Sequence, residues 1–295
     1  MKSFVSLSDI HMPYEDPQAI KLVTKFLTDF KPDKLILNGD IFDMPHISKY
    51  AVGRQEILKQ TPLQDHLDHG IEGIHKLIDA AHPREVKFAL GNHEARWDAY
   101  LGSKAPELAS LKCLEFDKVF KLDGIEWKRY GDGFWLNDRL FVYHGGYVGA
   151  NWTEKERKAI GASSITGHQH KQGVSYFTDR SRSYKNIGQG CLCKLNPPYL
   201  KTPADWQQGF VYGWIIDDDK FRAIETEIVR GADEIWMCPE GQVYRTALAS
   251  PERRATKTGS SRTRQTTRTR KSGTARAVPA STVHPPSVIE DLDDL

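Results

Sequence analysis

The chain has 295 residues, of which 39% are hydrophobic, and its 41 basic and 39 acidic side chains leave a formal net charge of +2. These values fit a globular protein with one large domain, or with one domain and a tail, and no run of about eighteen apolar residues is present to cross a membrane. Of the four cysteines only Cys191 and Cys193 are close in sequence, so we expect free, buried thiols and a cytoplasmic protein rather than a disulfide framework.

The first ninety residues contain three units of strand, loop and helix. Asp16 followed by Pro17 predicts a helix start, because aspartate caps the first turn and proline fits the first helical position. We place His66, His69 and His75 on the solvent side of the second helix. Consecutive units of this kind predict a parallel sheet with helices on its faces and the strand carboxyl ends at one edge. The expected elements are a strand at 2–8, a helix from Pro17 to Phe30, a strand at 34–37, a helix from Leu67 to Ala81 and a strand at 85–90.

From about Ile125 the chain consists of short β-rich runs separated by glycine turns. We expect them to form a second, mostly antiparallel layer of the same domain, which spans residues 1–248. The expected strands lie at 125–130, 134–136, 140–143, 164–166, 174–178, 182–187, 210–216 and 221–229, with a short helix at 153–160.

Residues 249–295 differ in composition from the rest of the chain. They are rich in Thr, Ser, Arg and Pro and contain almost no large apolar residue. Such a segment cannot bury enough apolar surface to offset the entropy lost on ordering. We therefore expect a disordered, low-complexity basic tail.

Polar side chains that can bind metal ions follow five of the β-rich runs. Asp9 and His11 are two residues apart, so an extended backbone would point both to the same side. The carboxyl ends of neighbouring parallel strands share an edge, and we expect the side chains that follow them to meet there. The other runs end at Asp40, at Asn92 and His93, at His144, and at His168 and His170.

Five short motifs resemble, in this order, those of the calcineurin-like metallophosphoesterase superfamily. They are Asp9-Ile10-His11, Gly39-Asp40-Ile41-Phe42-Asp43, Gly91-Asn92-His93-Glu94, His144-Gly145 and Gly167-His168-Gln169-His170. The resemblance covers about residues 3–170, and it is closest to uncharacterised members from bacteria and phages. It implies an α/β fold of four layers (α/β/β/α), in which helices flank a two-layered mixed β-sheet sandwich.

The resemblance also implies a binuclear metal centre. One ion would be held by Asp9, His11, Asp40 and His170, and the other by Asp40, Asn92, His144 and His168. Oxygen and imidazole ligands without thiolate suit two divalent ions, with manganese as the first expectation and Fe, Zn, Co or Ni as alternatives. Two such ions leave a net positive site even with two aspartates and a bridging hydroxide, so the site would attract a phosphoester substrate. We expect a hydrolase of phosphate mono- or diesters that acts by in-line attack of the metal-bridging hydroxide.

His93 is next to a ligand but is not itself assigned as one. The resemblance implies a hydrogen bond from His93 to Asp43, and a carboxylate partner favours the imidazolium form. We predict that His93 is a general acid or transition-state stabiliser and that Asp43 orients it. The alternative is a His93 ring that only caps the helix starting near Glu94.

The phosphate-binding arginine of the superfamily's protein phosphatases is missing. These enzymes have arginine and glycine after the second aspartate of the second motif, where this chain has Met44-Pro45. Arg96 and Arg54 are candidates to bind the substrate instead, with an ordinary surface position as the alternative for both.

Two other functions stay open. Residues 252–276 contain nine basic side chains and one acidic one, which makes this segment a candidate for nonspecific nucleic-acid contact and the protein a candidate nuclease. Against this, the tail has no aromatic residue to stack on bases. The other alternative is a catalytically inactive scaffold of the same fold, although such proteins usually lack some of the ligands. No contact with a membrane is expected.

Overall fold

The computed structural model describes residues 1–49, 61–197 and 204–248. Arg54 and the predicted tail, including residues 252–276, lie outside the described residues. The described elements are β1 (Lys2–Leu7), α1 (Pro17–Phe30), β2 (Lys34–Leu37), η1 (Pro45–Ile47), α3 (Leu63–Ala81), β3 (Glu85–Ala89), α4 (Asn92–Lys104), η3 (Pro106–Leu108), η4 (Lys112–Leu114), α5 (Phe116–Val119), β4 (Glu126–Lys128), β5 (Gly133–Trp135), β6 (Leu140–Tyr143), α6 (Trp152–Ile160), β7 (Ser163–Thr166), β8 (Gln172–Thr178), β9 (Ser183–Gln189), β10 (Gly209–Ile215), β11 (Phe221–Glu227), β12 (Val229–Arg230), β13 (Glu234–Met237), η5 (Pro239–Gly241) and β14 (Tyr244–Ala247).

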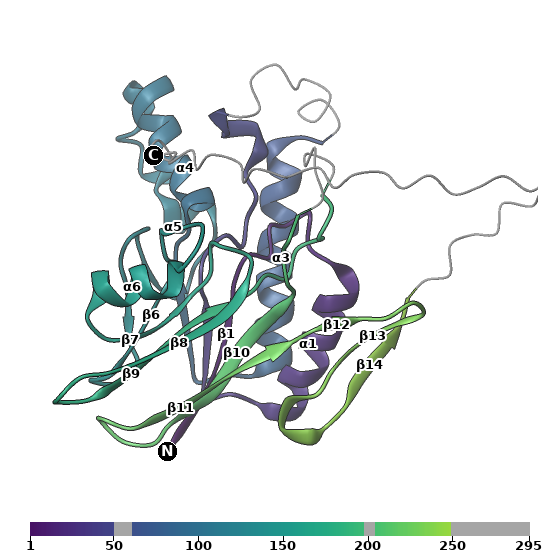
Figure 1. Ribbon diagram of the computed structural model, residues 1–295. Helices are drawn as coiled ribbons and strands as arrows, with labels where there is room; N and C mark the ends of the chain where they lie inside the picture. Colours follow the sequence, from purple (N-terminus) through teal and green to yellow (C-terminus); the bar gives the residue numbers. More distant parts are fainter. Residues whose placement is uncertain (50–60, 198–203, 249–295) are drawn as a thin grey trace, which may run out of the picture. The chain divides into compact units, whose positions relative to one another are not determined.

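The first sheet has six strands in the order β11-β10-β1-β2-β3-β4. β1, β2 and β3 run parallel, as the three strand–loop–helix units predict, β4 pairs parallel with β3, and β10 pairs antiparallel with β1. α1 begins where predicted, because the Asp16 carboxylate accepts hydrogen bonds from the backbone N–H groups of Gln18 and Ala19 and Pro17 is the first helical residue. α1 and α3 cover one face of this sheet (Figure 1), where their apolar side chains pack on Val5 and Leu35.

The second sheet has five strands in the order β5-β6-β7-β9-β8. The expectation of a mostly antiparallel layer is wrong, because β6–β7 and β7–β9 are parallel and only β5–β6 and β8–β9 are antiparallel. α6 lies between β6 and β7 in the sequence and acts as the crossover that parallel pairing requires. The expected places of β4, β10 and β11 in this layer are also wrong, since all three strands belong to the first sheet.

The two sheets pack face to face and bury a second core between them. Phe4, Ile36 and Val211 from the first sheet meet Val142 and Ile165 from the second. Successive residues of a strand point to opposite faces, so Phe4 joins this core whereas Val5 faces the helices.

α6 covers the outer face of the second sheet. Its Trp152 ring lies directly over Gly173 and Gly188, where a Cβ atom would collide with the indole. With α1 and α3 on the other side, the described residues form the predicted four-layer α/β/β/α arrangement (Figure 1).

Two features of the fold were not predicted. β12, β13 and β14 form a separate antiparallel sheet that packs on α1, where the rings of Tyr244 and Phe26 lie 5.8 Å apart. His66 is buried and packs edge-on against His46, with 4.7 Å between ring centroids, so its predicted solvent position is wrong. His69 and His75 are exposed, as expected.

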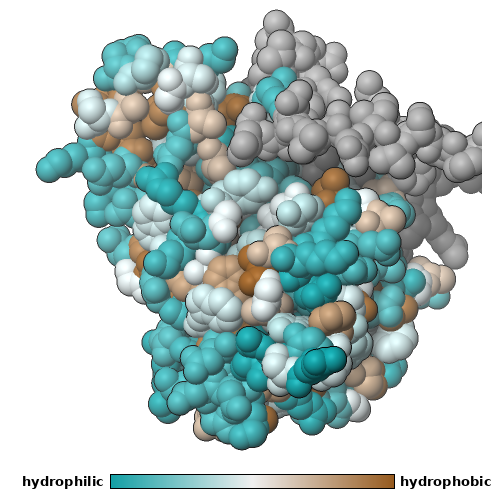
Figure 2. Space-filling model, turned by 60° about the vertical axis from the view of Figure 1, so that its left-hand side comes forward, coloured by the Kyte–Doolittle hydropathy of each residue, from teal (hydrophilic) through white to brown (hydrophobic). Residues whose placement is uncertain are grey.

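Exposed large apolar side chains are spread over separate elements. They include Leu108 in η3, Trp135 in β5 and Tyr176 in β8. The face shown in Figure 2 is mainly hydrophilic, with apolar residues in small groups. Scattered exposure of this kind is ordinary for a folded protein. None of the helices within the described residues has the length and apolar character needed to span a bilayer.

Candidate metal centre

The predicted ligands meet at the carboxyl edge of the two sheets. Asp9 and His11 follow β1, Asp40 follows β2, Asn92 follows β3, His144 follows β6, and His168 and His170 follow β7. Asp9, His11, Asp40, His144 and His170 are all buried. Polar and ionisable groups withdrawn from water to this degree need partners or a bound ion.

The first group of donors consists of Asp9, His11, Asp40 and His170. One ligand atom from each lies within 4.8 Å of the others. His170 Nε2 is 3.0 Å from Asp9 Oδ1 and 3.0 Å from His11 Nε2, and His11 Nε2 is 3.8 Å from Asp40 Oδ2. This group is the set that the superfamily resemblance implies for the first ion.

The second group shares Asp40 with the first and adds His144 and His168. Asp40 Oδ2 lies 3.3 Å from His144 Nε2. The Asn92 side-chain oxygen is 3.3 Å from His144 Nε2 and 2.9 Å from His168 Nδ1. The structure thus brings all seven predicted ligands together in two groups that have one carboxylate in common.

Five of these residues have a left-handed backbone. The φ angles are 53° for Asp9, 53° for His11, 51° for Asp40, 67° for His168 and 57° for His170. The expectation that Asp9 and His11 point to one side from an extended strand is therefore wrong, although their side chains do converge. Non-glycine residues at positive φ cost on the order of 1–3 kcal/mol each and are concentrated at functional sites.

Hydrogen bonds behind the rings orient two of the histidines. His144 Nδ1 lies 2.8 Å from the backbone oxygen of Asn38, to which it donates, so Nε2 is left to face Asp40. His11 Nδ1 is 2.9 Å from Asp43 Oδ1, so its Nε2 likewise points into the centre. Partners of this kind fix the tautomer and the ring orientation of a metal-binding histidine.

The aspartates and histidines of the centre shift one another's pKa values strongly. Burial alone would lower the pKa of His144, but the carboxylates of Asp40 and Asp9 outweigh burial and raise it to about 10. Burial would also lower the pKa of His170, and Asp9 raises it to about 10. Burial and the neighbouring His144 instead lower the pKa of His168 to about 4.

His93, Asp43 and Arg96 form a contiguous group beside the first set of donors. His93 Nδ1 donates to the Asp43 backbone oxygen at 2.7 Å and lies 3.4 Å from Asp43 Oδ1. His93 Nε2 is 3.8 Å from Asp40 Oδ2. Burial lowers the pKa of His93, but Asp40 and Asp43 outweigh it and raise the pKa above its ordinary value. Arg96 donates to the Asp43 backbone oxygen at 2.8 Å and lies against the His93 ring.

Two buried glutamates hold the loops of the centre, and neither was assigned a role from the sequence. The Glu94 carboxylate accepts hydrogen bonds from the backbone N–H groups of Asp40, Ile41, Phe42 and Gly91. The Glu156 carboxylate accepts from the N–H groups of Gly146 and Tyr147, just after His144. The sequence signal for Glu94 is its position three residues after the helix cap Gly91, where a glutamate completes a capping box.

Glycines allow the loops to approach the donors closely. A Cβ atom on Gly91 would collide with the Asp40 carboxylate, and one on Gly39 would collide with the His144 ring. Gly39 also has φ +83°, which other residues rarely adopt. These positions are therefore closed to larger side chains.

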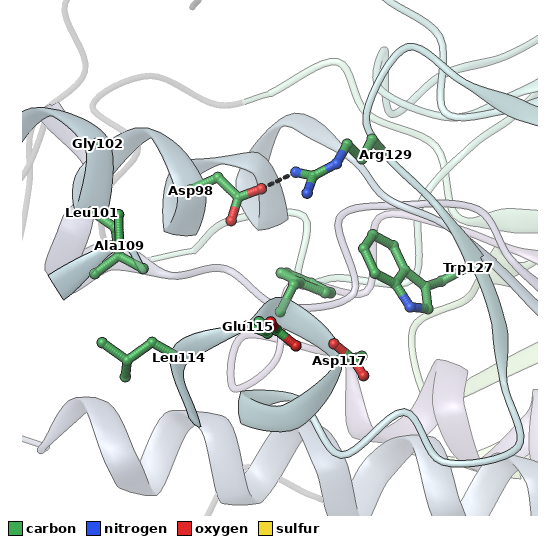
Figure 3. Close-up of a pocket in the computed structure, with 10 residues that line it drawn as sticks. Asp98, Leu101, Gly102, Ala109, Leu114, Glu115, Asp117, Trp127 and Arg129 are labelled. Atoms are coloured by element: carbon green, nitrogen blue, oxygen red, sulfur yellow. Dashed lines mark hydrogen bonds and ion pairs between the residues drawn. The ribbon is translucent and has the colours of Figure 1, made fainter. Parts of the chain in front are cut away.

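A separate cavity of about 460 Å³ lies between α4, α5 and β4. Figure 3 shows its lining, in which Asp98 from α4 pairs with Arg129 and Trp127 is contributed by β4. None of its lining residues belongs to the metal centre.

The chain belongs to the calcineurin-like phosphoesterase family, whose sequence model matches residues 2–186. Members of this family are metal-dependent phosphoesterases, and the buried aspartate and histidine groups described above lie mainly within the matched region.

Its relatives include two phage proteins. The Gene 54 protein of Mycobacterium phage L5 is 27% identical over 226 residues, which cover 71% of this chain and 87% of that protein. The Gene 54 protein of Mycobacterium phage D29 is 28% identical over 223 residues, with the same coverage of 71% and 87%. Among solved structures, the zinc complex of wild-type Vps29 from Entamoeba histolytica matches 83% of this chain and 98% of its own, at 13% identity and a TM-score of 0.42.

Proposed function

We propose that the protein is a phosphoesterase that hydrolyses phosphate mono- or diesters with two divalent metal ions. The observation that carries this proposal is the pair of buried donor groups that share Asp40. One ion would be held by Asp9, His11, Asp40 and His170, and the other by Asp40, Asn92, His144 and His168.

The donor atoms fit such ions. His11 Nε2 and His170 Nε2 lie 3.0 Å apart with the Asp9 and Asp40 carboxylates around them. Buried nitrogen and oxygen atoms aimed at a common point are the arrangement that a divalent cation stabilises. Carboxylate, amide and imidazole donors suit manganese first, with Fe, Zn, Co or Ni as alternatives.

Bound divalent ions supply Lewis acidity toward phosphate oxygens and make water reactive near neutral pH. The protein contributes only two carboxylates to the seven donors, so the centre keeps the positive charge that attracts a phosphate ester. Asp43 and Asn38 hold the rings of His11 and His144 in the orientation that the ions need. The backbone of the Asp40 loop is fixed by Glu94.

His93 is suited to give a proton to the leaving oxygen. The raised pKa of its imidazole, caused by Asp40 and Asp43 against the effect of burial, favours the charged form. Asp43 orients the ring through Nδ1, and Nε2 lies 2.9 Å from a guanidinium nitrogen of Arg96 and 3.8 Å from Asp40 Oδ2. Arg96 lies against the same ring, and its guanidinium is the candidate to bind a substrate oxygen.

Hydrolysis of p-nitrophenyl phosphate and of its bis ester tests the proposal. We expect manganese-dependent hydrolysis that is lost with a chelator, and the ratio of the two rates separates a phosphatase from a phosphodiesterase. His144→Gln should lose the second ion and most turnover, whereas His75→Gln, an exposed change on α3, should lose neither. Equal rates with and without chelator would contradict the proposal and favour the inactive scaffold.

A further inference from the structure

Two thiols lie next to one of the metal-centre histidines. One ring nitrogen of His170 and the sulfur atoms of Cys191 and Cys193 are within 4.8 Å of one another. All three residues are buried, and both cysteines are fully so. Cysteine is often buried as a small apolar residue, but here two thiols converge on an imidazole.

The ring of His170 has one nitrogen to offer to these thiols. Its Nε2 already faces Asp9 and His11 at 3.0 Å. Its Nδ1 is buried and has no nitrogen or oxygen hydrogen-bond partner among the described residues, and the thiols of Cys191 and Cys193 lie next to the ring. A buried polar atom without a partner costs free energy, which makes Nδ1 the nitrogen available for a ligand on the thiol side.

The backbone that carries the thiols is fixed. The N–H groups of Leu192 and Cys193 both donate to the backbone oxygen of Asp9 at 3.0 Å, and the N–H of Cys191 donates to Gln207 at 3.0 Å. The Cys191 thiol donates a long hydrogen bond of 3.5 Å to the Gln207 backbone oxygen. These backbone hydrogen bonds hold the segment that carries the two thiols next to His170.

We propose that Cys191, Cys193 and His170 Nδ1 form a site for one thiophilic metal ion, of the class of Zn²⁺ or Cd²⁺, next to the binuclear centre. Two thiolates and one imidazole are a donor set that such ions prefer, and one coordination position is left for a further ligand. Binding releases the two thiol protons to solvent and, where the His170 ring carries a proton on both nitrogens, the Nδ1 proton as well. The binuclear centre contains no sulfur donor, so the two kinds of site differ in the ions that they select.

This site and the binuclear centre share His170. A neutral imidazole has one lone pair, so a ring that binds an ion through Nδ1 keeps its proton on Nε2. In this geometry Nε2 can donate that proton to Asp9 Oδ1 at 3.0 Å. A thiophilic ion would then withdraw one ligand from the first catalytic ion and lower hydrolysis. This consequence rests on the proposed function, whereas the existence of the site does not.

Cadmium absorption tests the site on the full-length, metal-free protein. A cadmium–thiolate bond gives an ultraviolet charge-transfer band, which oxygen and nitrogen ligands do not give. We expect a band that saturates at one cadmium ion per chain, that disappears in C191S/C193S and that persists in C113S/C238S. The last variant is the matched control, because it removes the two exposed thiols. If the double variant does not fold, Cys191→Ser and Cys193→Ser replace it singly.

Inhibition of the manganese-loaded protein tests the shared ligand. One equivalent of cadmium should lower hydrolysis by about ten-fold or more in the wild type and in C113S/C238S, because losing a metal-site interaction typically costs 10–100-fold. Hydrolysis by C191S/C193S should fall much less.

Absence of the absorption band, or a band that survives in C191S/C193S, would overturn the site. A band without inhibition would overturn the sharing of His170. A protein that hydrolyses nothing would remove the proposed function, and the absorption result would still decide the site.

Discussion

The His93 ring lies between two aspartate carboxylates and an arginine guanidinium. Its Nε2 is 3.8 Å from Asp40 Oδ2, its Nδ1 contacts Asp43, and the Arg96 guanidinium lies against the ring. Arg96 lowers the pKa of His93 whereas the two aspartates raise it, and the aspartates outweigh both Arg96 and burial. The raised pKa favours the protonated ring, which is the form that the proposed general acid requires.

Replacing His93 by asparagine separates catalysis from metal binding. The substitution removes the ionisable ring but none of the seven proposed ligands, so both ions should stay bound. Turnover should fall by about 10²–10⁴-fold, the usual contribution of a general acid. Metal content per chain and the turnover number measured on the same preparation check this. Full turnover with two ions bound would show that His93 has no catalytic part.

The pKa values of His144 and His170 predict how pH affects the protein in chelator. Both values are raised to about 10, against an ordinary value of 6.5. A histidine whose pKa is raised on folding stabilises the fold below pH 6.5 and loses that contribution as the pH rises toward 10. His168, whose pKa is lowered to about 4, destabilises the fold only below pH 6.5.

We therefore expect the metal-free protein to melt at a lower temperature at about pH 9 than at about pH 6.5. Ions bound to these rings replace their protons, so the manganese-loaded protein should show a smaller change over the same range. Melting curves at both pH values, with manganese and with chelator, measure this difference. The same slope in both states would contradict the placement of His144 and His170 in the metal centre.

Hydrogen bonds and close packing hold the start of helix α4 against the loop after β2. Glu94 binds four backbone N–H groups, three of them in the Asp40 loop, and Gly91 leaves no room for a Cβ atom beside Asp40. Helix α4 and strand β2 therefore position Asn92, His93 and Asp40 as one unit.

Gly91→Ala should disturb the packing of α4 against the Asp40 loop. Gly102→Ala, in the same helix, provides the control. The added Cβ at Gly91 would meet the Asp40 carboxylate, and overpacking of this kind typically costs about 1–3 kcal/mol. No atom lies within 4 Å of a Cβ built on Gly102, so Gly102→Ala should stabilise the protein by about 0.5–1 kcal/mol. Thermal melting and metal content measure both effects. Wild-type melting and two bound ions in Gly91→Ala would refute the close approach.

The strand ends that carry the ligands could be predicted because each is a local pattern of an apolar run followed by a polar residue. The placement of β10 in the first sheet, and of β11 that pairs with it, could not be predicted, because the pairing of β10 with β1 joins residues more than two hundred positions apart. The left-handed backbone of Asp9 and His11 could not be predicted from residue type, because positive φ is uncommon for any residue other than glycine, even though aspartate and histidine adopt it more often than most. The short strands β12 to β14 have too few residues for alternation to stand out.

At the scale of the whole molecule, the metal centre is built entirely from residues before Cys191. Residues 249–295 contribute no proposed ligand, and their basic segment is the observation behind the nuclease alternative. The predicted boundary at residue 248 therefore separates the proposed metal centre from the basic segment. Hydrolysis and DNA binding can then be measured independently.

A chain that ends at Leu248 tests this boundary. It should keep the melting temperature and the manganese-dependent turnover of the full chain. Under the nuclease alternative, the full-length protein should bind DNA with an affinity that falls steeply with salt, and the shortened chain should lose this binding, because nine basic side chains are removed. DNA binding that survives the deletion would place the DNA-binding surface within residues 1–248. The absence of DNA binding by the full-length protein at low salt would remove the nuclease alternative.

In the proposed centre, two ions share one carboxylate. Anomalous scattering at the manganese edge, from crystals grown with manganese, locates these ions. We expect two peaks, both bonded to Asp40, with His170 beside one and His144 beside the other. A single peak, peaks remote from Asp40 or no peak at all would contradict it.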